Sequence, residues 1–308
     1  MKEKEHSFID KYVKIIVVFA VIAGSASGVF GRLIDAPPMA IGFWRLAMGM
    51  PFFLLPMAKD RFKKVSQVGS KDKMLAALGG FFLFAHFYTW FTAVKNTNIA
   101  SASVLAALHP VVVLFITVFI FRKKVKFSGV LAIILAIMGG SLIAGFDYSQ
   151  ISSGNFYGDI MAVGAAFFMG LYFATGDYVR KRVDGPTYVF MVFASCLTCF
   201  TLGMFMSGTA FFKYSPESFL YLVGLTLVCQ IGSHAVFNLC FGHVSSLYVS
   251  AWESGESVFA IILSFIFLQQ IPTKWEILGG TIVVMALIYY NFVTRDDEER
   301  QWELENEL

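Results

Sequence analysis

The stretch IASASVLAALHPVVVLFITVFIFRKKVKFSGVLAIILAIMGGSLIAGF, residues 99–146, holds two apolar runs separated by a short basic segment. The runs cover residues 99–121 and 127–146, and the four cations of this stretch lie between them. An α-helix needs roughly 20 apolar residues to cross a hydrocarbon core of about 30 Å. Two such runs joined by a cationic turn predict two consecutive membrane-spanning helices.

Eight further runs of similar length surround this pair. The charged residues make up only 15% of the 308-residue chain and the hydrophobic residues 57%, whereas an ordinary soluble domain is about 25% charged. We therefore predict an all-α polytopic membrane protein with ten transmembrane helices, and we exclude an ordinary soluble domain. The eight further runs are residues 13–33, 38–58, 74–94, 157–179, 186–208, 218–241, 245–268 and 275–293.

The basic residues sort to one side of a membrane when these ten runs are threaded through it alternately. Cytoplasmic connections carry an excess of Lys and Arg, so the crowded side is predicted to be cytoplasmic. Both termini then lie in the cytoplasm, and the protein is expected to be a multi-pass protein of the cell inner (plasma) membrane. The formal charge of +3 gives no indication of a nucleic-acid partner. The sparse side holds only Arg32, Lys95, Lys213 and Lys274.

The second half of the chain echoes the first at a shift of 147 or 148 residues. His86 falls on His234 and Pro38 on Pro186 at a shift of 148, and Ser103 falls on Ser250 at 147. Each half holds five runs, an odd number, so the second copy must enter the membrane upside down. This predicts two inverted five-helix repeats, an architecture that places a substrate site between the halves. The serine-containing loop at 147–156 is the predicted joint.

Four segments carry a resemblance to a known family: PPMAIGFWRL (37–46), AHFYTWFTAVKNTNIASASVLAALHP (85–110), GSHAVFNLCFGHVSS (232–246) and SGESVFAIILSFIFLQQIPT (254–273), followed by a Gly pair at 279–280. In this order they resemble the EamA branch of the drug/metabolite transporter superfamily. The resemblance implies two EamA repeats, here 13–146 and 157–293, followed by a cytoplasmic tail at 294–308. It also implies secondary transport of small metabolites, often export, without an ATPase domain. The chain departs from the family pattern at Ser257, where proline is common, and at Gln269 and Gln270, where an acidic residue is usual.

Two carboxylates stand out because ionisable side chains inside a membrane span cost roughly 2.5–3.5 kcal/mol to insert. Glu253 and Glu256 are three residues apart, which places both on one face of a continuous helix beside Trp252. Two close carboxylates in a low dielectric do not easily both ionise, so one is expected to hold a proton or pair with a cation. A proton-coupled carrier or an amine-binding site needs this arrangement, and the alternative is a structural pair bound to Arg45 or to backbone amides. We expect Glu253 to contact substrate or proton and Glu256 to be architectural.

Two i, i+4 pairs occupy repeat-related positions: His86 with Trp90, and His234 with Asn238. Symmetric placement predicts that both pairs face the cavity between the halves. Histidine exchanges protons near neutral pH, and tryptophan offers a cation–π face. The alternative is that each histidine hydrogen-bonds the backbone of a neighbouring helix.

Further polar residues inside the runs have less specific expectations. Arg45 is a candidate substrate contact or, by preference, a structural counter-ion. His109 precedes Pro110, which indicates a hinge or simple packing. The GSASG segment at 24–28 is expected to allow close helix packing, with Ser25 and Ser27 as candidate cavity hydroxyls.

The predicted function is that of a secondary carrier exporting a small polar metabolite, such as an amino acid, an amine or a drug-like compound. Its expected partners are that substrate and the lipid bilayer, with protons as a candidate coupling ion. The chain has no HExxH or GxSxG motif, so no catalytic residue, metal site or cofactor is expected. An importer of a small cationic or nucleoside-like metabolite is the alternative, and a channel or a membrane-embedded enzyme is the rival class. No sequence feature indicates the oligomeric state.

Overall fold

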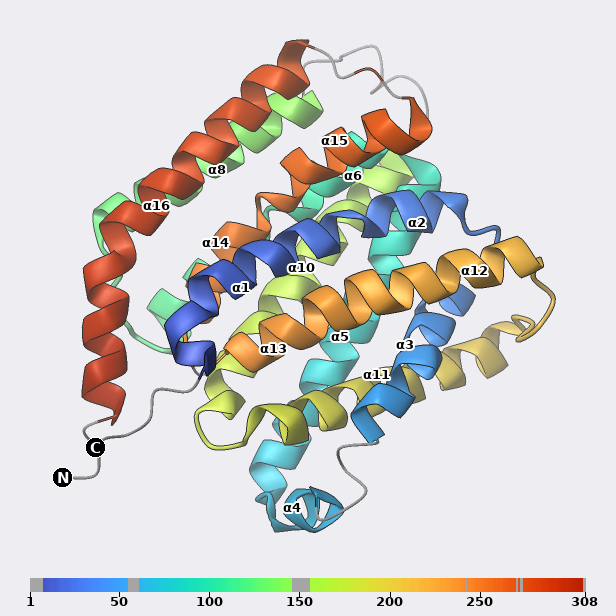
Figure 1. Cartoon of the computed structure of the whole chain (residues 1–308), viewed down its shortest axis with the longest axis horizontal. Helices are drawn as coiled ribbons and strands as arrows, with labels where there is room; N and C mark the ends of the chain where they lie inside the picture. Colours follow the sequence, from blue (N-terminus) through green and yellow to red (C-terminus); the bar gives the residue numbers. More distant parts are fainter. Residues whose placement is uncertain are drawn as a thin grey trace.

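The computed structural model describes residues 8–54, 61–145, 156–241, 243–269, 271 and 274–306, which form a bundle of helices (Figure 1). Within this described part there is no β-strand, and an isolated bridge joins Phe241 and Val244. The all-α prediction is therefore confirmed. The predicted joint at 147–156 lies outside the described residues except for Phe156.

The first half of the chain contains one long unbroken helix, α5, and several interrupted ones. The first apolar run bends at Ala26, and the fourth run is broken at Ala107 and Leu108 and then continues into a π-helical segment. A short helix, α4, precedes α5 and was not predicted. The elements are α1 (Phe8–Ser25), α2 (Ser27–Leu33), α3 (Pro38–Leu54), α4 (Arg61–Gln67), α5 (Ser70–Asn96), α6 (Ile99–Ala106), α7 (His109–Phe115), η2 (Ile116–Ile120) and α8 (Phe127–Gly145).

The second half begins with two unbroken helices and continues with two interrupted ones. The α11 helix shows why the boundaries fall where they do. The Asp184 side chain accepts a hydrogen bond from the Thr187 amide at its start, and Gly208 adopts φ +65° at its end. The elements are α10 (Phe156–Arg180), α11 (Gly185–Ser207), α12 (Pro216–Gly224), η3 (Leu225–Ala235), α13 (Val236–Cys240), α14 (Ser246–Glu253), α15 (Glu256–Leu268) and α16 (Lys274–Asn306).

Helix α16 continues well past the predicted end of the last run at residue 293. The first residues of the predicted tail extend this helix to Asn306. The reason is compositional, because residues 294–306 contain no glycine or proline and include four Glu and two Arg, which favour helix.

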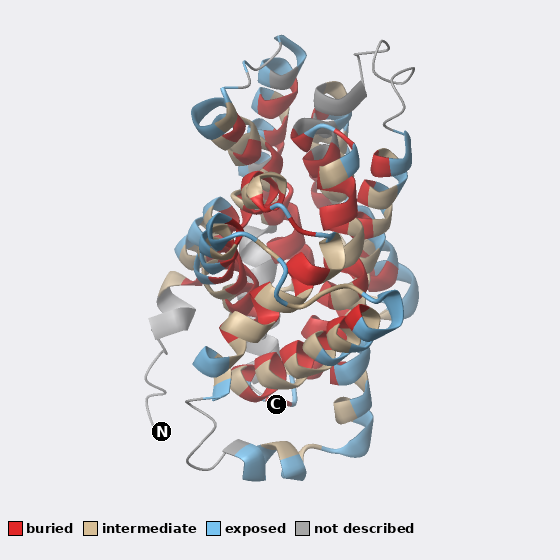
Figure 2. Ribbon diagram, turned by 90° about the vertical axis from the view of Figure 1, so that its right-hand side faces the viewer, coloured by how far each residue is buried: buried red, intermediate tan, exposed pale blue. Residues whose placement is uncertain are grey.

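Six helical stretches among the described residues are long and apolar enough to cross a membrane. Four shorter apolar helices, Pro38–Leu54, His109–Ile120, Phe127–Gly139 and Ile277–Tyr290, coincide with the remaining predicted runs. Large apolar side chains such as Phe119, Met206 and Phe292 are exposed on the bundle, while the buried residues form its interior (Figure 2). An exposed apolar surface around a buried core is what a bilayer-embedded bundle requires, so the fold is that of a multi-pass membrane protein.

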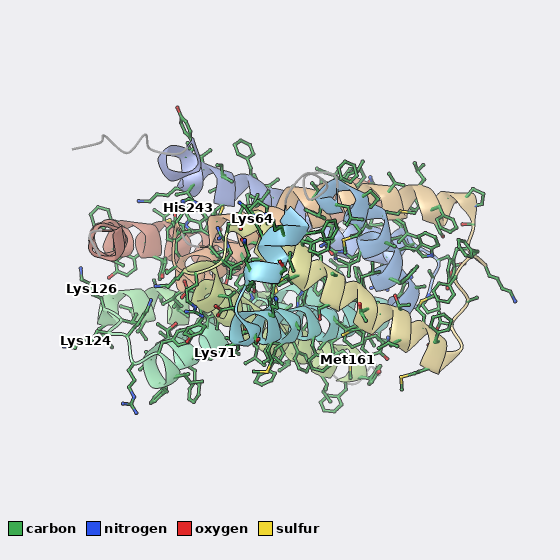
Figure 3. All side chains as sticks on the ribbon, turned by 90° about the horizontal axis from the view of Figure 1, so that it is seen from below. Lys64, Lys71, Lys124, Lys126, Met161 and His243 are labelled. Atoms are coloured by element: carbon green, nitrogen blue, oxygen red, sulfur yellow. The ribbon has the colours of Figure 1, made fainter. Side chains whose placement is uncertain are left out.

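One end of the bundle is rich in basic residues. Helix α1 begins and α16 ends at the lower left of Figure 1, and α4 lies at the bottom. In the view from below, Lys124 and Lys126 lie at the left edge, and Lys64 and Lys71 lie nearer the middle (Figure 3). These are residues that the sequence assigned to the cytoplasmic face.

An ion pair at this end joins the first turn of α5 to the connection between α10 and α11. The Arg182 guanidinium, in the turn between α10 and α11, lies with Nη2 2.6 Å from Asp72 Oδ1 and with Nε 3.2 Å from both Asp72 oxygens. This hydrogen bonding raises the pKa of Arg182. The Arg182 guanidinium also lies 4.2 Å from the Tyr178 ring, so the start of α5 is tied to the end of α10.

Helices from the two halves of the chain pack against each other throughout the bundle. Helix α3 packs on α11, α8 on α16, and α5 on α10, while α1 packs on η3 and α13. The interrupted helices also meet, α6 against α15 and α7 against α14. Every one of these contacts joins an element of the first half to an element of the second, so the interface between the halves is the core of the molecule.

Candidate functional site

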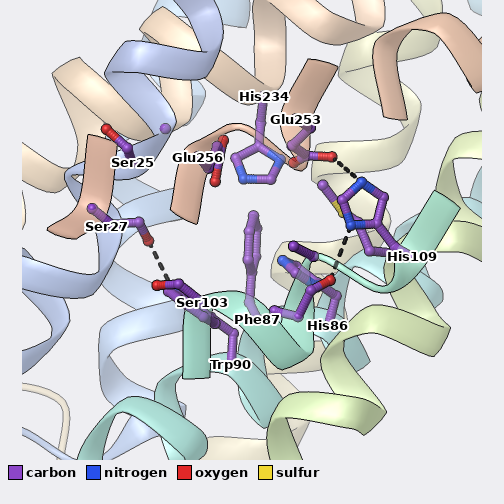
Figure 4. A pocket seen from close by; sticks show the side chains of 15 residues that line it. Ser25, Ser27, His86, Phe87, Trp90, Ser103, His109, His234, Glu253 and Glu256 are labelled. Atoms are coloured by element: carbon purple, nitrogen blue, oxygen red, sulfur yellow. Dashed lines mark hydrogen bonds and ion pairs between the residues drawn. The ribbon is translucent and has the colours of Figure 1, made fainter. Parts of the chain in front are cut away.

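A cavity of about 540 Å³, measured together with its open mouth, lies between helices of both halves (Figure 4). Its walls come from α1, α2, α5, α6, α7 and α10, and from η3, α14 and α15. The wall combines hydroxyls, imidazoles and carboxylates with apolar side chains. Its lining residues are Gly24, Ser25, Ser27, His86, Phe87, Trp90, Ser103, Ala106, Ala107, His109, Met169, His234, Glu253, Glu256 and Ala260.

Two helix breaks meet at this cavity. The chain leaves α6 after Ala106 and re-enters helix at His109, since Pro110 has no amide hydrogen and fits only the first turn of a helix. In the second half, α14 ends at Glu253 and α15 begins at Glu256. The Ser254 hydroxyl, between these two helices, donates a 3.3 Å hydrogen bond to the Ala107 carbonyl. The breaks therefore touch, and each brings ionisable side chains to the cavity.

An ion pair crosses between the two breaks. His109 Nε2 lies 3.0 Å from Glu253 Oε2, and the two side chains are only 4% and 6% exposed. His109 Nδ1 lies 3.0 Å from the Ala106 carbonyl, and Nε2 also lies 3.2 Å from the Ser250 carbonyl. Carbonyl oxygens only accept hydrogen bonds, so both carbonyls are satisfied when both ring nitrogens of His109 carry a proton, while Glu253 Oε2 lies at ion-pair distance without a hydrogen bond of its own among the described residues. The geometry thus fits an imidazolium paired with a carboxylate.

The Glu256 carboxylate has a different environment. It lies against Gly24, because a Cβ built at position 24 would be 2.0 Å from Glu256 Oε1 and 2.7 Å from the Ser233 hydroxyl. Glycine is needed there for space. Among the described residues no cation lies within ion-pair distance of this carboxylate. Glu256 is half-buried and borders the cavity, so its carboxyl group is available to a bound molecule.

The two repeat-related histidines lie close together. Their ring centroids are 6.1 Å apart, and the edge of His234 meets Phe87 at 4.8 Å. His86 Nδ1 lies 2.9 Å from the Ala165 carbonyl of α10, while His234 Nδ1 has no hydrogen-bond partner in the part of the chain that the structure describes. His86 therefore takes a backbone contact with one nitrogen and still lines the cavity, whereas His234 retains a free nitrogen.

Trp90 joins the cavity wall to α2. Its indole nitrogen donates a 3.0 Å hydrogen bond to the Ser27 hydroxyl, and both residues are buried. The Ser25 hydroxyl donates to the Ile22 carbonyl at 2.6 Å. Both serines, which were candidate cavity hydroxyls, line the cavity.

Five of the eight predicted site residues line the cavity: His86, Trp90, His234, Glu253 and Glu256. The other three, Asn238, Trp252 and Arg45, are outside the lining set. The Asn238 amide donates to the Tyr172 hydroxyl and, at 2.7 Å, to the His234 carbonyl. Trp252 is half-buried, with its ring centroid 6.4 Å from that of Tyr248.

Arg45 is fully buried and lies behind the cavity wall. Its Cζ is 3.9 Å above the centre of the Phe87 ring, a cation–π distance. The alternative in which Arg45 pairs with Glu253 or Glu256 is not what the structure shows, because among the described residues Glu253 pairs with His109 and no carboxylate reaches Arg45.

Sequence reasoning missed the role of His109 in the site, because Pro110 offered a sufficient explanation as a hinge. The sequence nevertheless held a signal for His109, since at a shift of 147 residues it falls on Glu256.

In the described part of the chain no group of three or more His, Cys, Asp or Glu side chains is arranged to hold a metal ion.

Comparison with known proteins gives matches along nearly the whole chain. An uncharacterised transporter of Bacillus subtilis, YxxF, is 23% identical over 273 residues, which cover 88% of this chain and 86% of that protein. An uncharacterised transporter of Archaeoglobus fulgidus is 23% identical over 286 residues, covering 90% and 95% of the two chains. The pseudopaline exporter CntI of Pseudomonas aeruginosa is 22% identical over 281 residues, covering 88% and 94%.

A solved structure described only as "Crystal structure of protein" shares the fold. It has a TM-score of 0.74 and 14% sequence identity, and the match covers 94% of this chain and 99% of that one. The EamA-like transporter family matches this chain twice, at residues 12–145 and 156–292, so that each match contributes one of the two broken helices at the cavity. With both segments matched, the chain belongs to the EamA-like transporter family.

Proposed function

We propose that this protein is a secondary active transporter that exports a small polar metabolite, such as an amino acid, an amine or a drug-like compound, by alternating access. The observation that carries the proposal is the crossing of the two broken helices at the cavity, where the His109–Glu253 pair links the two family-matched segments. Broken helices in the core of an inverted-repeat carrier are typical of its substrate and coupling-ion site. A movement of one segment against the other would alter this contact directly.

The proposed topology has ten transmembrane helices in two inverted five-helix repeats, 13–146 and 157–293. The six long and four shorter apolar helices agree with this number. The packing agrees with a two-fold relation between the repeats, because α3 packs on its counterpart α11 and α8 on its counterpart α16, and because the contact of α5 with α10 has its counterpart in the contact of α1 with η3. The basic end of the bundle supports an inner-membrane protein with both termini, including the tail 294–308, in the cytoplasm.

The proposed substrate contacts are the five predicted residues that line the cavity, with Asn238, Trp252 and Arg45 around them. The unpaired Glu256 favours a substrate with a positively charged group. The buried His109–Glu253 pair offers a place where one proton enters or leaves, which supports protons as the coupling ion. Export is favoured by the relative that is named as an exporter.

Mass spectrometry of metabolites inside and outside cells tests this proposal. Cells expressing the wild type are compared at equal membrane abundance with cells expressing Glu253→Gln, Glu256→Gln or His86→Ala. Glu217→Gln, an exposed residue on α12 bonded to Tyr221, is the matched control. We expect the wild type and the control to deplete one class of compound from the cell, and the cavity variants to lose this effect.

Each other outcome shows which part of the proposal is wrong. Redistribution that persists in all cavity variants would leave transport intact and reject the site. Accumulation inside the cell would indicate the importer alternative. Flux in proteoliposomes that neither saturates nor shows counter-transport would indicate a channel, and no redistribution of any compound would reject transport.

A further inference from the structure

The Arg45 guanidinium is buried in the bundle without a hydrogen-bonded anion among the described residues. The group is completely buried, and none of its three nitrogens has a hydrogen-bond partner among the described residues. The Phe87 and Phe91 rings, at 3.9 and 5.7 Å, are its aromatic neighbours. A cation buried away from water without a partner is strongly destabilising, so such a group is expected to meet an anion in some state of the protein.

A second unsatisfied group occupies the helix that faces Arg45. Gln230 of η3 is completely buried, and both its amide nitrogen and its amide oxygen lack partners in the described part of the chain. The two helices are in contact here, since the Thr226 hydroxyl lies 3.3 Å from the Arg45 carbonyl and a Cβ at Gly49 would be 3.5 Å from Gln230 Cγ. A guanidinium and an amide N–H donor on facing helices match the acceptor oxygens of a carboxylate.

This polar cluster adjoins the cavity. The Phe87 ring contacts Arg45 on one side, lines the cavity, and meets His234. The Phe87 side chain is thus the wall between the unpaired guanidinium and the bound molecule.

We propose that Arg45 and Gln230 form a second subsite that binds a carboxylate of the transported molecule when the Phe87 ring moves aside, while the amine of that molecule faces Glu256. The inference rests on the proposed transport function and makes it more specific, because it assigns an amino-carboxylate as substrate class. Phe87 then acts as the partition between the amine and carboxylate subsites.

Matched pairs of compounds that differ only by the carboxylate test the subsite: histidine and histamine, tryptophan and tryptamine, lysine and cadaverine. Their binding to purified full-length protein in detergent is measured by calorimetry. In the wild type we expect at least one amino acid to bind about tenfold more tightly than its amine. This is the affinity gain that one hydrogen bond to a charged group provides. Arg45→Gln should abolish this preference, so that each amino acid binds no more tightly than its amine, and an elution profile on size exclusion equal to that of the wild type shows that the variant is folded. Gln230→Met, which preserves volume, should reduce the preference about threefold.

Two results would overturn the subsite. One is a wild type in which no amino acid binds more tightly than its amine. The other is a preference that survives in both Arg45→Gln and Gln230→Met, which would mean that water or the Phe87 ring alone satisfies Arg45. If amines bind and are redistributed by cells without any preference for carboxylates, the subsite fails and transport stands. Absence of any redistribution would instead reject the transport function itself.

Discussion

The strength of the His109–Glu253 ion pair can be measured through the change in the free energy of unfolding when its members are replaced. Both side chains are almost completely buried and their charged atoms are 3.0 Å apart. Removing one member of a buried ion pair leaves the other charge uncompensated and typically costs about 3–5 kcal/mol. We therefore expect His109→Leu and Glu253→Met each to lower the free energy of unfolding by about 3–5 kcal/mol.

The double variant should be much less destabilised than the sum of the two single variants. With both charges removed, the remaining polar loss is the donor to the Ala106 and Ser250 carbonyls, about 1 kcal/mol for each hydrogen bond. The coupling energy from the double-mutant cycle, which is the sum of the two single effects less the effect of the double variant, should accordingly be about 4 kcal/mol or more in favour of the pair. Equilibrium unfolding by dodecyl sulfate in mixed micelles, followed by tryptophan fluorescence, measures all four proteins.

A second cycle on Asp72 and Arg182 supplies the matched control. That pair is closer, at 2.6 Å, but the Arg182 side chain is 41% exposed, so its coupling should be only about 0–1 kcal/mol. Equal coupling in the two cycles would show that burial does not set the strength of the cavity pair. Additive effects of His109→Leu and Glu253→Met would refute the ion pair itself.

Three further substitutions test the packing around the site with the same unfolding assay. Gly24→Ala places a methyl 2.0 Å from the Glu256 carboxylate, so transport should fall at least about tenfold. The unfolding free energy should change by less than about 1 kcal/mol, because the Glu256 carboxylate is the end of a flexible side chain that can move. Gly69→Ala, which has no neighbour within 4 Å, is the control and should transport normally. Gly80→Ala places its methyl 2.5 Å from a backbone carbonyl of α11 and should lower stability by about 1–3 kcal/mol; an unchanged stability would contradict this packing. Trp90→Phe removes the indole hydrogen bond to α2 and should cost about 1 kcal/mol, whereas no measurable cost would mean that this bond contributes nothing.

The positions of most cavity residues could be predicted because polar side chains are costly in a membrane and therefore face the interior of the bundle. This reasoning gives the face of a helix but not the partner of a side chain. His109 illustrates the limit, since its partner Glu253 lies 144 residues away and meets it only when the two halves pack. Arg45 was expected by preference to be a structural counter-ion, but among the described residues its guanidinium has no hydrogen-bonded carboxylate and lies over the Phe87 ring.

The prediction for Glu253 and Glu256 reached the right cavity by an incomplete argument. Three-residue spacing puts both on one face of a continuous helix, whereas the helix is broken between them and each lies at a helix end. Asn238 shows a related difficulty. Its amide bonds the carbonyl one turn earlier, a local contact that short polar side chains often prefer to a cavity.

The proposed repeat gives the two glutamates different roles. At a shift of 147 residues, His109 falls on Glu256 and Ala106 falls on Glu253. The counterparts of His109 and Glu253 are thus Glu256 and Ala106, and alanine offers Glu256 no charge. Glu253 is therefore paired with His109 within the protein, whereas Glu256 borders the cavity with no cation at ion-pair distance among the described residues. This asymmetry favours Glu256 as the group that meets the positive charge of the substrate and Glu253 as the group that holds the two halves together, the reverse of the expectation from sequence alone.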